Sequence, residues 1–157
     1  SLEESKSEIL KLEQKIISDA KIEIEEKTRK SIYNYSFGSS GINTQGEVSD
    51  VELIDAFLNK IFLGISSEDY TEFNFAMGML LSKDNMDFIE KLALGSYSGE
   101  KLEAYKVFLA SINDYKLLLN SKGLVSNTKM VFKTNDRAIK TATEKMRISH
   151  LRFKAIR

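Results

Sequence analysis

The feature that most constrains the fold is the complete absence of proline from a chain of 157 residues. Proline interrupts helices because it lacks a backbone donor and clashes with the preceding turn, so its absence favours long uninterrupted helices. Apolar residues recur at intervals of three and four along nearly the whole chain, as in amphipathic helices. The sequence therefore predicts an all-α fold: an antiparallel bundle of four main amphipathic helices with one short extra helix, in a single domain spanning residues 1–157.

The breaks in this pattern give the expected helix boundaries. A first helix is expected over residues 2–35, with an apolar stripe that includes Ile9 and Ile16 and faces the bundle. Residues 37–46 contain three glycines and make the clearest break, and Ser49 with Glu52 forms a capping box that starts a second helix. The remaining helices are expected from Ser66 or Ser67 to residue 81, briefly around residues 88–92, from Ser98 to about residue 122, and from about Asn127 to residue 156.

The composition offers little for enzyme chemistry. The chain has no cysteine, which excludes disulfides and thiol chemistry, and its one histidine, His150, is expected at the edge of the apolar side of the last helix. No Glu-x-x-His motif of the di-iron bundles occurs. We therefore expect a protein that is not an enzyme and that has no cofactor, no metal site and no small-molecule substrate.

Charge is strongly separated along a chain whose net charge is zero. Residues 31–128 hold seven Lys or Arg and thirteen Asp or Glu, whereas residues 129–157 hold nine bases and two acids. Separation of this kind within a small domain indicates a charged face that meets a partner.

The bases of the last segment fall on one side of the predicted final helix. At 100° per residue, six of them share one arc: Lys129, Lys133, Arg137, Lys140, Arg147 and Lys154. Two interpretations stay open at this point. The arc is either a binding surface, or a solvated face whose bases pair with acids on neighbouring helices and add little stability.

One segment resembles a known family. Residues 21–30, Lys-Ile-Glu-Ile-Glu-Glu-Lys-Thr-Arg-Lys, run into Tyr33-Asn-Tyr-Ser-Phe-Gly38, and the whole chain is rich in Lys, Ile, Asn and Ser. This pattern is similar to the C-terminal helical domain of the fibronectin-binding surface lipoproteins of Borrelia spirochaetes. The resemblance covers nearly the whole chain.

The resemblance implies a location, a partner and an activity. It implies an outer-membrane lipoprotein at the cell surface that evades immunity by binding the r subcomponent of the first complement component, a serine protease, and by inhibiting the classical pathway. Basic residues of a helical bundle make that contact in the family. Charge geometry assigns the role here to Lys129, Lys133, Arg137 and Lys140, with Arg29 and Lys30 as a second contact.

Three alternatives use the same basic helix. It could lie along phosphates in a nucleic-acid-binding accessory domain, which we rank below a protein partner. It could bind a different host serum protein, such as a complement regulator or plasminogen. Direct membrane association is weaker, because the apolar face of the helix is needed for the core, so we expect membrane attachment only through a lipid anchor that this chain does not contain.

Overall fold

The computed structural model describes residues 1–38, 47–124 and 136–157, and these residues form helices and no strands. The all-α prediction is therefore confirmed for this part of the chain. The helices are α1 (Leu2–Phe37), α2 (Asp50–Ser66), α3 (Tyr70–Leu81), α4 (Lys83–Ser96), α5 (Gly99–Ser121) and α6 (Arg137–Ala155). The described residues form six helices, which match the six segments expected from the breaks in the pattern but not the summary of four main helices and one short one. The helix expected to be brief, α4, has 14 residues and is longer than α3, with 12.

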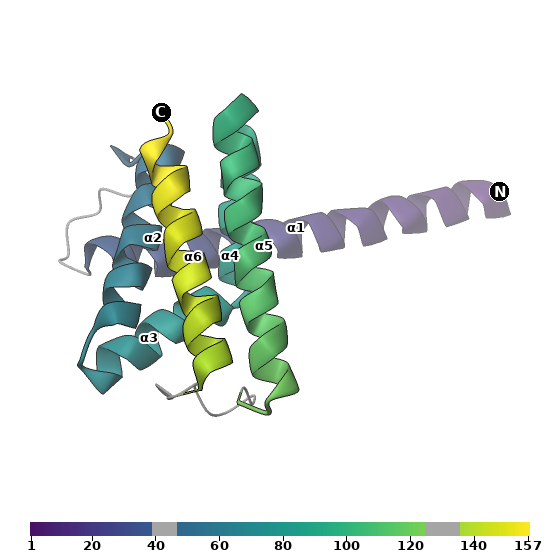
Figure 1. Cartoon of the computed structure of the whole chain (residues 1–157). Helices are drawn as coiled ribbons and strands as arrows, with labels where there is room; N and C mark the ends of the chain where they lie inside the picture. The colour runs from purple at the N-terminus through teal and green to yellow at the C-terminus, as the bar shows by residue number, and fades with distance from the viewer. Residues whose placement is uncertain (39–46, 125–135) are drawn as a thin grey trace.

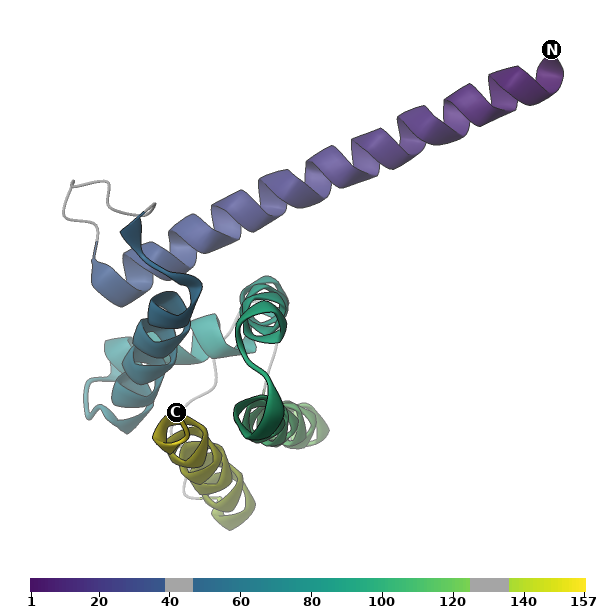
Figure 2. The ribbon, with the colours of Figure 1, turned by 90° about the horizontal axis from the view of Figure 1, so that it is seen from above.

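Helix α1 belongs to the folded domain only at its C-terminal end. Its N-terminal half extends away from the other helices in both views (Figures 1 and 2). Thr28, Ile32 and Tyr33 are its buried residues, whereas Ile9 and Ile16 are 55% and 67% exposed. The expectation that the apolar stripe of this helix faces the bundle is therefore wrong. The reason is geometric, because α1 crosses the domain near its C-terminus and no described helix runs beside its first half.

Helix α2 lies at the centre of the domain and contacts α1, α3, α4 and α6. The hydroxyl of Ser49 accepts a hydrogen bond from the Glu52 N–H at 3.1 Å, which confirms the predicted N-cap. From this start, α2 directs a continuous apolar face inward, and five of its side chains are fully buried: Leu53, Ile54, Phe57, Leu58 and Ile61. Burial of this extent makes α2 the main contributor to the core.

The short turn between α2 and α3 differs from the prediction in its capping residue. Asp69 is the N-cap of α3, and its Oδ1 accepts from the Thr71 N–H at 2.8 Å. Ser67, one of the two expected caps, instead accepts from the Asp69 N–H at 3.0 Å. The two helices then approach closely at Gly64, where a Cβ would lie 2.5 Å from the Cβ of Ala76. Glycine at this position therefore permits the α2–α3 contact.

Helices α5 and α6 form the layer farthest from α1. They lie side by side in both views and run in opposite directions (Figures 1 and 2). The Lys101 ammonium, on α5, donates to the carbonyls of Phe153 and Ile156 at 2.6 and 2.7 Å. This lysine caps the C-terminal end of α6: it adds a second donor to the Phe153 carbonyl, which also accepts from the Ile156 N–H at 3.3 Å, and it binds the carbonyl of the C-cap residue Ile156. The interaction fixes α6, and the surface it carries, against α5.

Candidate functional site

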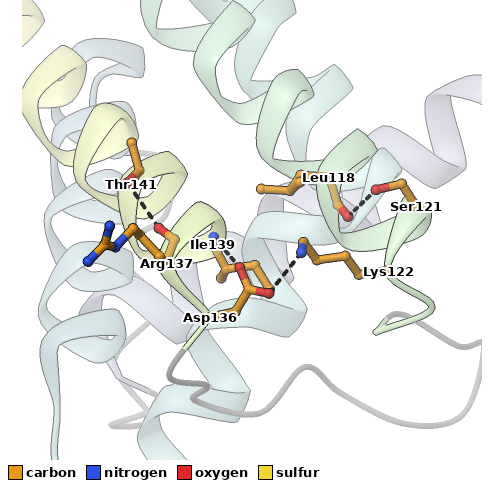
Figure 3. Close-up of polar contacts among 7 residues, drawn as sticks. All are labelled: Leu118, Ser121, Lys122, Asp136, Arg137, Ile139 and Thr141. Atoms are coloured by element: carbon orange, nitrogen blue, oxygen red, sulfur yellow. Dashed lines mark hydrogen bonds and ion pairs between the residues drawn. The ribbon is translucent and has the colours of Figure 1, made fainter.

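The candidate site depends first on where α6 begins. The prediction of one continuous helix from near Asn127 to residue 156 is wrong, because Asp136 is an extended N-cap with φ −61° and ψ 123° and α6 begins after it. The predicted start near Asn127 lies outside the described residues. Its Oδ1 accepts from the Ile139 N–H at 3.1 Å, and its Oδ2 receives the Lys122 ammonium at 2.8 Å (Figure 3). The run Thr134-Asn135-Asp136 consists of residues that favour such caps, and this was the signal in the sequence.

This boundary divides the predicted basic arc. Lys129 and Lys133 lie outside the described residues, while Arg137 and Lys140 are exposed in the first turns of α6. Figure 3 shows the side chain of Arg137 pointing away from the Asp136–Lys122 ion pair. Positive charge near a helix N-terminus opposes the helix dipole, so these two bases do not serve the stability of α6.

The bases of α6 form two rows on its outer face. Lys140, Arg147 and Lys154 follow one another at seven-residue intervals and therefore remain on one line along the helix. Lys145 and Arg152 form a second line on the other side of the same face. All five side chains are exposed. We call this face, which also includes Arg137, the α6 surface.

Among the described residues, no acid of another helix forms an ion pair with a base of the α6 surface, although Asp114 of α5 lines the same groove as Arg137 and Lys145. Within the described residues, the only ion pair made by a base of α6 joins Arg147 to Glu144 on the same helix. The ion pairs between elements lie elsewhere: Arg29–Asp50, Lys91–Glu25 and Lys122–Asp136. The interpretation in which the basic face is paired with acids of neighbouring helices therefore does not describe the part of α6 that the structure contains.

Apolar side chains lie between the two basic rows. Ile148 and Leu151 are 39% and 50% exposed and share one turn of α6. Beside the row that contains Lys145, a groove of about 660 Å³ runs between α5 and α6, and its lining includes Leu118, Thr141 and Ala142. The α6 surface therefore combines cations, an exposed apolar pair and a concave edge.

Arg29 and Lys30, the expected second contact, lie on a different side of the molecule. Figure 2 places α1 and α6 at opposite edges of the domain, with α2 and α4 between them. Arg29 is bound within the domain, because its guanidinium pairs with Asp50 at 3.1 Å and donates to the Val48 carbonyl at 3.2 Å. Lys30 is exposed. The structure thus does not bring these two bases together with Arg137 and Lys140.

His150 lies in the core rather than at its edge. Only 5% of its surface is exposed, and its ring stacks on Phe62 with the centroids 4.7 Å apart. Burial, together with the positive charges of Lys154 and Lys101, lowers the pKa of His150 to about 4. A neutral imidazole packed against aromatic rings is a structural residue. Its position four residues after Met146 and three before Phe153 was the signal for burial.

The other features of the domain and the comparisons with known proteins add little to the choice between the candidate functions. In the described ranges, no group of three or more His, Cys, Asp or Glu side chains is arranged to bind a metal ion. No helix in those ranges has the length and apolar character required to span a bilayer. Comparison of the chain with family models, curated proteins and solved structures gives no match.

Proposed function

We propose that this chain is a non-enzymatic binding domain exposed at the surface of a spirochaete cell, and that it contacts its partner through the α6 surface. The observation that carries this proposal is that the bases of α6 are exposed and, Arg147 apart, lack an acidic partner among the described residues. The resemblance to the fibronectin-binding lipoproteins supplies the partner: the r subcomponent of the first complement component. Binding would then inhibit the classical pathway.

A protein partner explains the α6 surface better than a nucleic acid does. Protein interfaces combine apolar contacts with a polar rim, and Ile148 and Leu151 lie between the two rows of bases in that way. Phosphate binding requires only the bases and gains nothing from an exposed apolar pair. A host serine protease with an acidic binding cleft offers both kinds of contact.

The mechanism we propose uses the rigidity of the helix. A Lys or Arg side chain held on α6 enters the acidic specificity pocket of the protease, but the backbone that carries it stays helical. Cleavage requires an extended substrate backbone, so the bound residue occupies the pocket without being cut. Lys140, which is exposed and makes no ion pair in the described residues, is the α6 base we assign to this role.

The scaffold we propose for this surface is an antiparallel four-helix bundle made of α2, α4, α5 and α6, with α1 and α3 packed across it. The close α5–α6 contact and the Lys101 cap of α6 support this arrangement. Lys129 and Lys133 precede α6 and remain part of the proposed contact. Arg29 and Lys30 remain a proposed second contact, on the side of the domain that carries α1.

A pull-down from serum tests the partner. The intact domain should recover the complement protease, and the double charge reversal K140E/K154E should lose it. The double reversal K60E/K106E is the matched control, because Lys60 and Lys106 are exposed lysines of α2 and α5. Recovery of a complement regulator, of plasminogen or of no serum protein by the intact domain would overturn the proposal.

A second variant separates protein binding from nucleic-acid binding. Replacing the apolar pair, I148S/L151S, should weaken a protein contact by about tenfold or more, because buried apolar contacts at the centre of an interface contribute most of its affinity. The same variant should leave binding to a DNA duplex unchanged. DNA binding that falls steeply with salt and is not affected by I148S/L151S, with no protease binding, would assign the α6 surface to nucleic acid.

A further inference from the structure

The N-terminal half of α1 carries large apolar side chains that no described residue covers. Ile9, Leu12 and Ile16 are 55%, 61% and 67% exposed, and Leu2 is 72% exposed. At 100° per residue these four positions fall within one arc of the helix. The helix itself extends away from the domain (Figure 2). An apolar row of this length on a projecting helix is unusual for an isolated chain and indicates an interaction site.

The spacing of this row is that of a coiled-coil seam. Leu2, Ile9 and Ile16 recur every seven residues, and Leu12 occupies the position three residues after Ile9. In heptad terms, the first three residues stand at a positions and Leu12 stands at a d position. We call these four residues the α1 seam. Isoleucine at a and leucine at d favour two strands over three or four in parallel coiled coils, so this rule bears on the number of strands and not on their orientation.

We propose that the α1 seam binds the α1 seam of a second copy of this chain, with the two helices antiparallel. In this register, Ile9 packs against Leu12 of the second copy, and Leu12 packs against Ile9 of the second copy, so these two residues make the apolar centre of the contact. Leu2 and Ile16 lie toward its ends, opposite Asp19 and Ser5 of the second copy. The contact is therefore self-complementary about a two-fold axis that passes between residues 10 and 11, as expected of a symmetric dimer.

The charges that flank the seam select the second copy and its orientation. Lys6 and Glu13 stand at e positions, and Glu8 and Lys15 stand at g positions. Antiparallel pairing brings e against e and g against g, so Lys6 meets Glu13 of the second copy and Glu8 meets Lys15 of the second copy. By symmetry, each of these opposite-charge pairs occurs twice.

Parallel pairing gives the opposite electrostatic result. It brings g positions against the following e positions, which places Glu8 against Glu13 of the second copy on both sides of the seam. Like charges opposite one another destabilise a helix pair. The same four flanking residues thus favour the antiparallel dimer and disfavour the parallel one.

The position of the domain is compatible with this dimer. From Ile17 onward α1 lies beside α4, where Ile17 lines a groove with Phe88 and Glu25 pairs with Lys91 at 2.7 Å, whereas the segment before it projects away from the other helices (Figure 2). Antiparallel pairing of the projecting segments places the two domains at opposite ends of the helix pair. The dimer would then present two copies of the α6 surface, which raises the apparent affinity for a partner with two accessible sites.

Molecular mass measured by sedimentation over a range of protein concentrations tests this proposal. The chain should shift from its monomer mass of 17.8 kDa to twice that mass as its concentration rises. Either K6E or E13K should raise the dimer dissociation constant by roughly tenfold, since each creates two like-charge pairs in place of two attractive pairs. The double exchange K6E/E13K restores the opposite charges and should restore the dimer. K11E, at an outward position of α1, is the control and should have no effect.

The orientation can be measured separately, because the chain has no native cysteine. A spin label at K21C, which points away from the seam, should report an axial separation of about 32 Å between the two labels, from a rise of 1.5 Å per residue. Parallel pairing has no such axial offset, and in that orientation E13K would strengthen association. Either of those results, or a monomer at every concentration, would overturn the proposal. Binding of the monomer to phosphatidylcholine–phosphatidylglycerol vesicles through the same four residues would instead assign the seam to a membrane.

Discussion

The projecting half of α1 and the central helix α2 carry the same amphipathic pattern in opposite environments. In α2, Phe57 and Ile61 are fully buried, and in α1, Ile9 and Ile16 are more than half exposed. The spacing of apolar residues therefore specifies a helix and its apolar face in both cases, but it does not specify what covers that face. In α2 the cover is the rest of the domain. For α1 we propose that it is a second copy of the chain.

The largest expected effect is on the free energy of unfolding, when a buried residue of α2 is replaced. Replacing Ile61 with alanine should lower the free energy of unfolding by about 2–5 kcal/mol, because the change removes buried methyl groups and leaves a cavity. Chemical denaturation followed by circular dichroism would measure the loss. A loss below about 0.5 kcal/mol, the range of ordinary surface changes, would contradict the central position assigned to α2.

Acid should destabilise the folded domain through His150. Its pKa is lowered to about 4 in the folded state, below the ordinary value, so the unfolded chain takes up a proton first as the pH falls. The stabilisation is fully present above about pH 6.5 and is lost as the pH falls toward 4. Between pH 7 and pH 4.5, wild type should lose about 2 kcal/mol more stability than H150F, which keeps an aromatic ring but cannot titrate. Parallel stability–pH curves for the two proteins would refute this.

The contact between Lys101 and the end of α6 should contribute a smaller amount to the stability of the folded domain. Lys101 donates to two carbonyls at the end of α6, and its ammonium lies 4.0 Å from the centroid of the Phe153 ring. The variant K101M keeps the aliphatic part of the side chain and removes the charge, and it should cost about 1–3 kcal/mol of stability. K106M, an exposed lysine of the same helix, serves as the control and should change stability little.

The smallest effect on the free energy of unfolding is expected for a substitution in the projecting half of α1. Ile16→Ala is the same substitution as Ile61→Ala, but at a side chain that is 67% exposed. At protein concentrations where the chain is monomeric, it should change the free energy of unfolding by no more than about 0.5 kcal/mol. At concentrations where the proposed dimer forms, it should reduce the population of dimer. A large loss of stability in the monomer would show that this part of α1 packs against its own domain.

The comparison between the buried residues of α2 and the exposed residues of α1 also shows what could be predicted from the sequence. The helical class, the Ser49 cap and the apolar face of α2 follow from local patterns that act within a few residues. The exposure of Ile9 and Ile16 does not follow, because it depends on where α1 crosses the domain. Covering a helix face is a tertiary property, and periodicity carries no information about the covering element.

The candidate surface shows the same division between local and tertiary information. The charge separation along the chain predicted a basic final helix, and α6 has exposed bases. The interruption at Asp136 was not expected, although aspartate is a favoured N-cap residue, because the apolar spacing continues across it. That the described bases of α6 form no ion pair with an acid of another described helix could not be predicted, since ion pairs between helices depend on side chains that are distant in sequence.

The most direct test of the central claim is the affinity of the purified domain for the r subcomponent of the first complement component, measured by surface plasmon resonance. The wild type should bind, K140E/K154E should bind at least about tenfold more weakly, and K60E/K106E should bind like the wild type. Equal affinities for wild type and K140E/K154E would contradict the assignment of the contact to the α6 surface. No binding by the wild type would contradict the proposed function itself.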